Sequence, residues 1–310
     1  MRASPPDERT AGTAQALTRD LLRRWPLPLN AGDDKHDRGT VLVIAGSVRT
    51  PGAALLAGLG ALRAGAGRVQ IASVAVTAAQ LGVAVPEALI HALPATAAGA
   101  IDPAAAVDML GGPVGEAETV LLGPGCEDPE ATRVLLERVL ALVSPEALVV
   151  LDALAVKVAP AEAMSVLRGR LILTPNRQEA LSLVRGDRAD KLDGGLAAAA
   201  AHRRGAVVTI SGHVASPDGR RWTAETAVSG LGTSGSGDVR SGIVAGAAAR
   251  CTDAAQAACW GTYIHLAAAA RLAERIGAIG YLARELLDEV PGVMERTMPA
   301  EEGVASSNTP

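Results

Sequence analysis

A run rich in glycine and serine is the strongest candidate for chemistry in this sequence. Residues 232–238 read GTSGSGD and lead into a helical pattern, VRSGIVAGAAAR. A Gly/Ser turn that begins a helix leaves several backbone N–H groups unpaired at the positive end of the helix dipole, where phosphate or a developing anion binds. Asp238 falls in the first turn, so its carboxylate could accept the proton of a hydroxyl that attacks phosphorus. The alternative is a carboxylate that only balances the dipole, but the density of Gly and Ser favours function.

Three further turns follow apolar, strand-like runs: GPG at 123–125, LTPNRQE at 173–179, and the segment 46–54. Each turn alone is compatible with an ordinary tight turn. Because ligands of open α/β sheets bind at the edge formed by the carboxyl ends of the strands, the four junctions together predict one shared cleft. Asn176 and Glu179 would face one side of a first helical turn. They indicate either ligands for phosphate or metal-bound water, or a helix capping box.

The elements that must position these turns alternate between strand and helix. Continuous apolar runs predict strands at 40–45, 68–74, 119–122, 147–151, 170–173 and 206–210. Such runs suit strands buried on both faces, and the alternation predicts a mainly parallel sheet covered by helices. Residues beyond 206 indicate short strands joined by turns, followed by helices at 237–249, 254–276 and 281–290. An amphipathic pattern at 13–25 suits a short helix.

Composition narrows the class of protein. A chain of 310 residues with 49% hydrophobic and 20% charged residues suits one large α/β domain. We expect an N-terminal arm at 1–30, partly disordered, a single domain at 31–298 and a disordered tail at 299–310. The net charge of −4 offers no electrostatic support for nucleic-acid binding. No signal segment or membrane span is indicated, and three cysteines without metal spacing suggest a reducing compartment, so we expect a cytoplasmic protein.

Taken in order, the motifs resemble those of the NAD(P)H-hydrate dehydratases, within the ribokinase-like superfamily. The resemblance covers about residues 35–292. It rests on Lys35 and Gly39 ahead of TVLVIAGS, then PGAALLAGLGALRAGAGRV, LLGPG, VVLDA, LTPNRQE, GTSGSGD and IGYLARELLDEVP. One such motif is weak, whereas the full set in this order is specific. The resemblance implies a three-layer ribokinase-like sandwich, with a mainly parallel central sheet and helices on both faces.

The resemblance also implies an activity. Family members restore NADH or NADPH from the hydrates NADHX and NADPHX. A nucleotide, ADP in bacterial members and ATP in eukaryotic ones, phosphorylates the hydrate hydroxyl with Mg²⁺ present, and elimination of phosphate regenerates the reduced ring. The implied partners are therefore hydrate and nucleotide, with no nucleic acid or membrane, and relatives are often homotetramers.

Site residues carry over by position. Asp238 would contact the hydrate and act as the base. Ala53, Gly125 and Asn176 would line the hydrate pocket, and Glu179 would act indirectly on the metal side. The nucleotide would be bound by Ser211, Gly212, His213, Val214 and Ala215 together with Gly235, Ser236 and Gly237.

The sequence departs from the family pattern at several positions. Residues 211–215 read Ser-Gly-His-Val-Ala where the family usually has Lys-Gly-x-x-Thr, so a strong phosphate partner is missing. Leu154 replaces an expected Asp, and Glu127 an expected Gly. The thirty or so residues ahead of the domain are too few for the epimerase domain that many bacterial relatives carry. Two alternatives stay open: a ribokinase-like kinase of a vitamin precursor or sugar-like alcohol, and a non-catalytic nucleotide-binding protein.

Overall fold

A single twisted sheet forms the centre of the molecule. The computed structural model describes residues 13–28, 38–184, 192–225 and 228–299. Within them a ten-stranded sheet has the order β1-β10-β9-β8-β7-β6-β5-β2-β3-β4. The strands from β8 to β4 are mutually parallel, and β9 runs antiparallel to both of its neighbours. The strands are β1 (Gln15–Ala16), β2 (Thr40–Ile44), β3 (Arg68–Val74), β4 (Leu89–Leu93), β5 (Thr119–Leu122), β6 (Leu148–Leu151), β7 (Leu171–Leu173), β8 (Val207–Ile210), β9 (His213–Ala215) and β10 (Arg221–Thr223).

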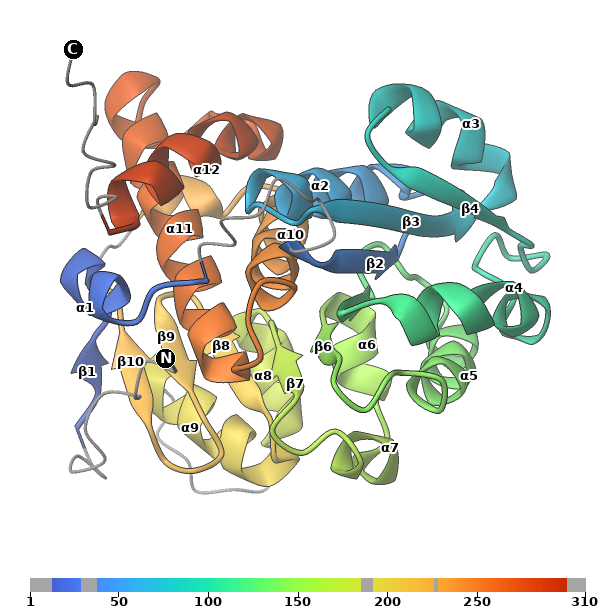
Figure 1. Cartoon of the computed structure of the whole chain (residues 1–310), viewed down its shortest axis with the longest axis horizontal. Coiled ribbons are helices and arrows are strands. Elements are labelled where there is room, and N and C mark those ends of the chain that lie inside the picture. The colour runs from blue at the N-terminus through green and yellow to red at the C-terminus, as the bar shows by residue number, and fades with distance from the viewer. Residues whose placement is uncertain (1–12, 29–37, 185–191, 226–227, 300–310) are drawn as a thin grey trace, which may run out of the picture.

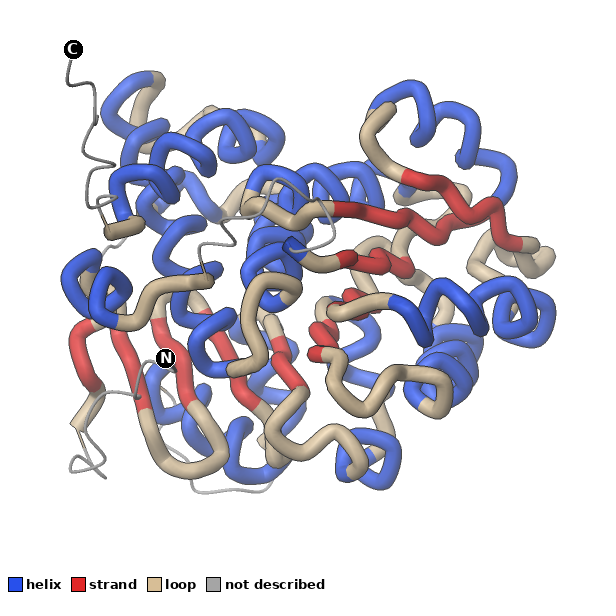
Figure 2. The backbone as a smooth tube through the Cα atoms, in the orientation of Figure 1, coloured by secondary structure: helices blue, strands red, loops and turns tan. Residues whose placement is uncertain are grey.

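Helices cover both faces of this sheet, as Figures 1 and 2 show. The described helices are α1 (Arg19–Arg24), α2 (Pro51–Arg63), α3 (Ala75–Ala84), α4 (Pro103–Glu116), α5 (Pro129–Leu140), α6 (Ala153–Val158), α7 (Ala161–Ser165), α8 (Arg177–Leu183), α9 (Asp193–Arg204), α10 (Ser236–Ala248), α11 (Ala254–Arg275) and α12 (Ala283–Thr297), with a 3₁₀ turn, η2 (Ser229–Leu231). Elements α1 to α3 and α10 to α12 pack on one face, and α4 to α9 on the other. The expected three-layer α/β sandwich is confirmed.

The central strands are apolar throughout because each face of the sheet packs against a separate hydrophobic core. Every residue of β2, β5, β6, β7 and β8 is buried. In β2, Val41 and Val43 face the core beneath α2 and α10, whereas Leu42 and Ile44 face the core beneath α4 and α5. Successive side chains of a strand point to opposite faces, so a strand buried on both faces needs a continuous apolar run.

Helices α2 and α10 lie in backbone contact. A Cβ added at Gly242 would stand 2.2 Å from the carbonyl oxygen of Ala57, and one at Gly246 would stand 2.5 Å from that of Ala61. No side chain fits in either place, so glycine is what allows the two helices to meet. This contact places the start of α10, with its Gly/Ser turn, beside the start of α2.

The structure differs from the sequence-based expectation in several places. The helix predicted at 13–25 is wrong over its first residues, because Gln15–Ala16 pair with β10 as strand β1 and α1 spans only Arg19–Arg24. The prediction that the last helix ends at residue 290 is wrong, because α12 continues through Pro291 to Thr297. Proline removes one intrahelical hydrogen bond, but Val290, Val293 and Met294 stay buried along the same stripe and hold the helix against the core. Strand β4 was not predicted, because it is a half-exposed edge strand without a continuous apolar pattern.

Described residues ahead of β2 pack onto the domain. Leu21, Leu22 and Trp25 are buried in the core that α11 and α12 share. The indole Nε1 of Trp260 donates a 2.8 Å hydrogen bond to the carbonyl oxygen of Trp25. Residues 1–12 and 300–310 lie outside the described residues, so the predicted arm, domain and tail boundaries stay predictions. None of the helices that the structure describes combines the length and apolarity needed to cross a membrane.

Candidate functional site

The loops after β2 and β5 are joined at the carboxyl edge of the sheet. The Gly46 amide donates a 2.8 Å hydrogen bond to the carbonyl oxygen of Pro124. The Thr50 hydroxyl donates to the carbonyl oxygen of Gly125 at 2.6 Å. The Ser47 hydroxyl donates to Oε2 of Glu127 at 2.7 Å. Glu127, one of the departures from the family pattern, therefore ties these two loops together.

Ala53 and Gly125, both predicted to line the hydrate pocket, are neighbours in space. A Cβ added at Gly125 would stand 2.7 Å from the Cβ of Ala53. Gly125 also has a φ of +66°, a conformation that favours glycine. Neither residue is part of the lining of the 390 Å³ pocket described below, so their contact with the hydrate stays a prediction.

The Gly/Ser turn forms an uncapped helix start. Helix α10 begins at Ser236, and Gly235 occupies the N-cap position with a φ of +87°. No side chain caps this end. The Ser236 amide donates a 3.3 Å hydrogen bond to the carbonyl oxygen of Thr233, so the amides of Gly237 and Asp238 are the ones that could bind an anion. Gly235 packs against Leu56 of α2, since a Cβ added there would stand 2.6 Å from that side chain. Asp238 lies in the first turn of α10, as predicted.

Two carboxylates interact at this helix start. Burial raises the pKa of Asp238 to about 7, and the nearby negative charge of Asp152 adds to the shift. Asp152 directly follows β6, is 4% exposed, and accepts a 2.7 Å hydrogen bond from the Thr174 hydroxyl. Its pKa is also raised by burial. A carboxylate with a pKa near neutrality is suited to general base catalysis.

Asn176 and Glu179 form the capping box that the sequence allowed as one alternative. The Glu179 amide donates to Oδ1 of Asn176, and the Asn176 amide donates to Oε2 of Glu179, both at 2.9 Å. The other oxygen of Glu179 lies 3.4 Å from Nζ of Lys157. The metal role predicted for Glu179 stays a prediction. In the described ranges, no group of three or more His, Cys, Asp or Glu side chains is arranged to hold a metal ion.

A pocket of about 390 Å³ opens beside the start of α10. It unites three predicted segments, since its lining includes Asn176, Ser211, Gly212, Ser236 and Gly237. Arg240 and His265 also line it, and neither was predicted. Nε2 of His265 lies 3.2 Å from the Ser236 hydroxyl. Burial, helped by the positive charge of Arg240, lowers the pKa of His265 to about 3, so its imidazole is neutral.

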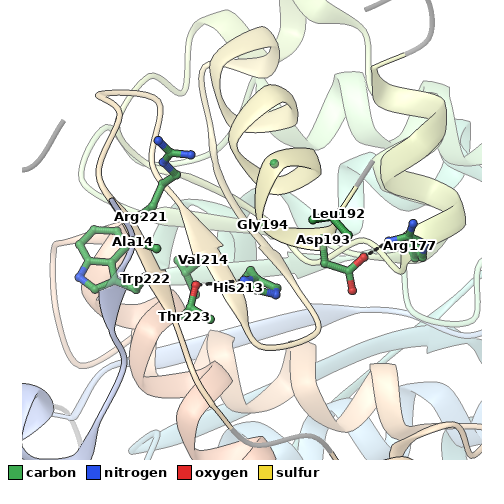
Figure 3. Close-up of a pocket in the computed structure, with 11 residues that line it drawn as sticks. Ala14, Arg177, Leu192, Asp193, Gly194, His213, Val214, Arg221, Trp222 and Thr223 are labelled. Atoms are coloured by element: carbon green, nitrogen blue, oxygen red, sulfur yellow. Dashed lines mark hydrogen bonds and ion pairs between the residues drawn. The ribbon is translucent and has the colours of Figure 1, made fainter. Parts of the chain in front are cut away.

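The predicted nucleotide loop at 211–215 divides between two places. Ser211 and Gly212 line the 390 Å³ pocket, whereas His213 and Val214 line a second pocket of about 570 Å³. Figure 3 shows this second pocket, where Nδ1 of His213 lies 3.0 Å from the Thr223 hydroxyl. The side chains of Val214 and Ala215 are buried in β9. Nucleotide contacts by these five residues stay predictions.

Arg177 lines both pockets, and Asp193 lines the second one. Their side chains form an ion pair, and the Ser211 hydroxyl donates a 3.0 Å hydrogen bond to Oδ2 of Asp193. Ser211 has a φ of +52°, an uncommon conformation for a residue other than glycine. The position where the family usually has Lys is therefore held by a bond to the start of α9.

The chain is similar to one family over most of its length. The family model described as NAD(P)H-hydrate dehydratase matches residues 41–292. An ADP-dependent (S)-NAD(P)H-hydrate dehydratase of Xanthomonas campestris is 39% identical over 292 residues, which are 93% of this chain and 98% of that protein. A bifunctional NAD(P)H-hydrate repair enzyme of Moorella thermoacetica is 34% identical over 263 residues, and the chain spans 49% of its length.

Solved structures agree with this similarity. The ADP/ATP-dependent NAD(P)H-hydrate dehydratase of Bacillus subtilis, co-crystallised with ATP/Mg²⁺, superposes with a TM-score of 0.73 at 26% identity, covering 92% of this chain and 99% of that one. A ribokinase-like superfamily protein of Enterococcus faecalis superposes with a TM-score of 0.75 at 18% identity, covering 92% of this chain and 96% of that one, which shows the shared fold.

Proposed function

Because the chain belongs to the NAD(P)H-hydrate dehydratase family, we propose that it restores NADH and NADPH from NADHX and NADPHX at the expense of a nucleotide. ADP is the proposed phosphate donor, since the relative from Xanthomonas campestris is ADP-dependent. The proposal concerns dehydration alone, because the chain spans only about half of the bifunctional relatives such as that of Moorella thermoacetica.

The observation that carries the proposal is the position and charge state of Asp238. Its carboxyl group lies in the first turn of an uncapped helix, and its pKa of about 7 lets it gain and lose a proton at neutral pH. The start of α10 supplies backbone amides for a migrating phosphoryl group in the same turn. A base and an anion site side by side are the parts that phosphorylation of a hydroxyl requires.

The chemistry proceeds in two steps. Asp238 takes the proton from the hydrate hydroxyl while the hydroxyl oxygen attacks the terminal phosphorus of the nucleotide. The bond from that phosphorus to its bridging oxygen breaks, and the nucleotide leaves with one phosphate fewer. The new phosphate ester then departs as inorganic phosphate from the ring carbon that carried the hydroxyl, and a proton is lost from the neighbouring carbon. The ring double bond returns. The hydrate has then lost the elements of water, which are taken up in the cleavage of the nucleotide to its shortened form and inorganic phosphate. Ala53, Gly125 and Asn176 would hold the hydrate in line with the nucleotide.

The 390 Å³ pocket is the proposed nucleotide site. Its walls combine the start of α10 with Ser211 and Gly212 after β8. Mg²⁺ bound to the phosphates would neutralise part of their charge. Asp152 and Glu179 are the nearby carboxylates that could reach such an ion through water, and no dedicated cluster of protein ligands is required.

The test is recovery of near-ultraviolet absorbance when purified protein, Mg²⁺ and ADP or ATP are added to NADHX. Asp238→Asn should lower turnover by about 10²- to 10⁴-fold, the usual contribution of a general base. Asp108→Asn, on the exposed side of α4, is a matched control that also removes one carboxylate and should keep full activity. Chelation of Mg²⁺ with EDTA should stop the wild-type reaction.

Other products would contradict the proposal. A stable phosphorylated substrate in place of free phosphate would identify a ribokinase-like kinase. If calorimetry detected no binding of ADP or ATP, the result would favour a non-catalytic role for the protein. Normal turnover by Asp238→Asn would show that another group is the base.

The proposal extends to a cytoplasmic homotetramer, as the family resemblance implies. The three cysteines are unpaired, which suits a reducing compartment. Light scattering on the purified protein would measure the assembly.

A further inference from the structure

Arg240 is a buried cation without a paired anion. Its side chain belongs to the second turn of α10, and the residue is 8% exposed. None of the ion pairs found among the described residues includes it. The carboxylates that influence it, Asp152 and Glu179, lie beyond ion-pair distance and accept hydrogen bonds from other groups. Burying an unpaired charge is costly, so an anion bound from outside the chain would stabilise Arg240.

The hydrogen bonds of Arg240 fix the guanidinium but leave it incomplete. Nη2 donates to the carbonyl oxygens of Thr174 and Pro175, which holds the group against the turn between β7 and α8. Nε is buried and has no hydrogen-bond partner. A buried donor without an acceptor destabilises the unliganded protein, and a ligand oxygen would relieve that penalty.

The position of Arg240 identifies the kind of anion. Its side chain lines the 390 Å³ pocket together with Ser236 and Gly237, whose helix start attracts negative charge. The other basic groups of this pocket are engaged or neutral: Arg177 is paired with Asp193, and His265 is uncharged at neutral pH. Arg240 is therefore the cation that remains for a ligand in this pocket.

We propose that Arg240 binds a phosphate group of the nucleotide directly and gives the pocket its preference for nucleoside diphosphates over nucleosides. The inference rests on the proposed function for the identity of the ligand. A planar guanidinium offers several parallel donors, and a charge-assisted bond to phosphate is about twice as strong as a neutral one.

Calorimetric titration of purified protein with ADP and with adenosine tests this role. In Arg240→Gln, which keeps a hydrogen-bond donor and loses the charge, the Kd for ADP should rise by about 10- to 100-fold, whereas the Kd for adenosine should change less than about twofold. Arg240→Lys, which keeps the charge, should fall between wild type and Arg240→Gln. Arg177→Gln is the matched control, and it should raise the ADP Kd less because that cation is already paired.

Several results would overturn the inference. Equal weakening of ADP and adenosine in Arg240→Gln would mean that the side chain only supports the pocket wall. An unchanged Kd for ADP would mean that Arg240 does not contact phosphate. These outcomes are distinct from failure of the proposed function. A wild-type protein that binds ADP but does not restore NADH would contradict the dehydratase proposal. The ratio of the Kd values for ADP and adenosine would still test the role of Arg240.

Discussion

Asp238→Asn is expected to stabilise the folded protein at alkaline pH while it lowers turnover. The pKa of Asp238 is about 7 in the folded state and 3.8 for an ordinary Asp. The native protein therefore binds this proton more tightly than the unfolded chain does. Stability that is present below the unfolded pKa is lost as the pH rises through 7, because folding must then keep a negative charge in a partly buried place near Asp152.

The magnitude follows from the size of the shift. About three pKa units, at about 1.4 kcal/mol each, set an upper limit of about 4 kcal/mol for the cost of the ionised carboxylate above neutral pH. More than half of it, about 2–3 kcal/mol, should develop between about pH 5 and about pH 8. Asn carries no charge at either pH, so the free energy of unfolding of the variant should lack this contribution to its pH dependence.

Urea unfolding of both proteins over this pH range measures the effect. The free energy of unfolding of Asp238→Asn minus that of wild type should increase with pH and level off above about pH 7 to 8. Asp108→Asn, exposed on α4, controls for loss of one acidic side chain. A difference in unfolding free energy that does not change with pH, or one that decreases as pH rises, would contradict a raised pKa of Asp238 in the folded protein.

Two further predictions concern neighbours of this carboxylate. Asp152→Asn removes the negative charge that adds to the pKa shift of Asp238, so the pH profile of kcat/KM should move to lower pH by up to about one unit; an unmoved profile would contradict the coupling. Gly125→Ala forces an L side chain into a φ of +66° and a Cβ to within 2.7 Å of Ala53. The substitution should lower the free energy of unfolding in urea by about 1–3 kcal/mol and raise the KM for the hydrate. A wild-type KM in this variant would show that Gly125 does not line the hydrate pocket.

The core strands could be predicted closely because their burial leaves a direct mark on sequence. The bounds of β3 and β5 match the predicted 68–74 and 119–122. A strand enclosed on both faces must be apolar at every position, and this pattern is hard to confuse with a loop. The edge strand β4 was missed for the same reason in reverse, since Leu89 is exposed and nothing about LIHAL separates it from a helix or a loop.

The carboxyl edge of the sheet could also be predicted, because topology brings all turns that follow parallel strands to one side. Its individual side chains could not. Helix α10 is buried nearly all round, so its sequence has no polar stripe that would assign Arg240 to the pocket. His265 lies in an alanine-rich helix, a setting typical of a core residue. It is buried, but it also lines the pocket beside Ser236.

Close packing of small residues explains how this site keeps its geometry. In the proposed reaction Ala53 of α2 contacts the hydrate and Asp238 of α10 is the base, so turnover would depend on the distance between these two helices. Those helices touch through backbone, with Gly242 against Ala57, and there is no flexible side chain between them to absorb a displacement. Reaction rates fall steeply when reacting groups shift by about 1 Å. Backbone contact between Gly242 and Ala57 and between Gly246 and Ala61 can therefore keep the proposed base on α10 at a fixed distance from Ala53 on α2.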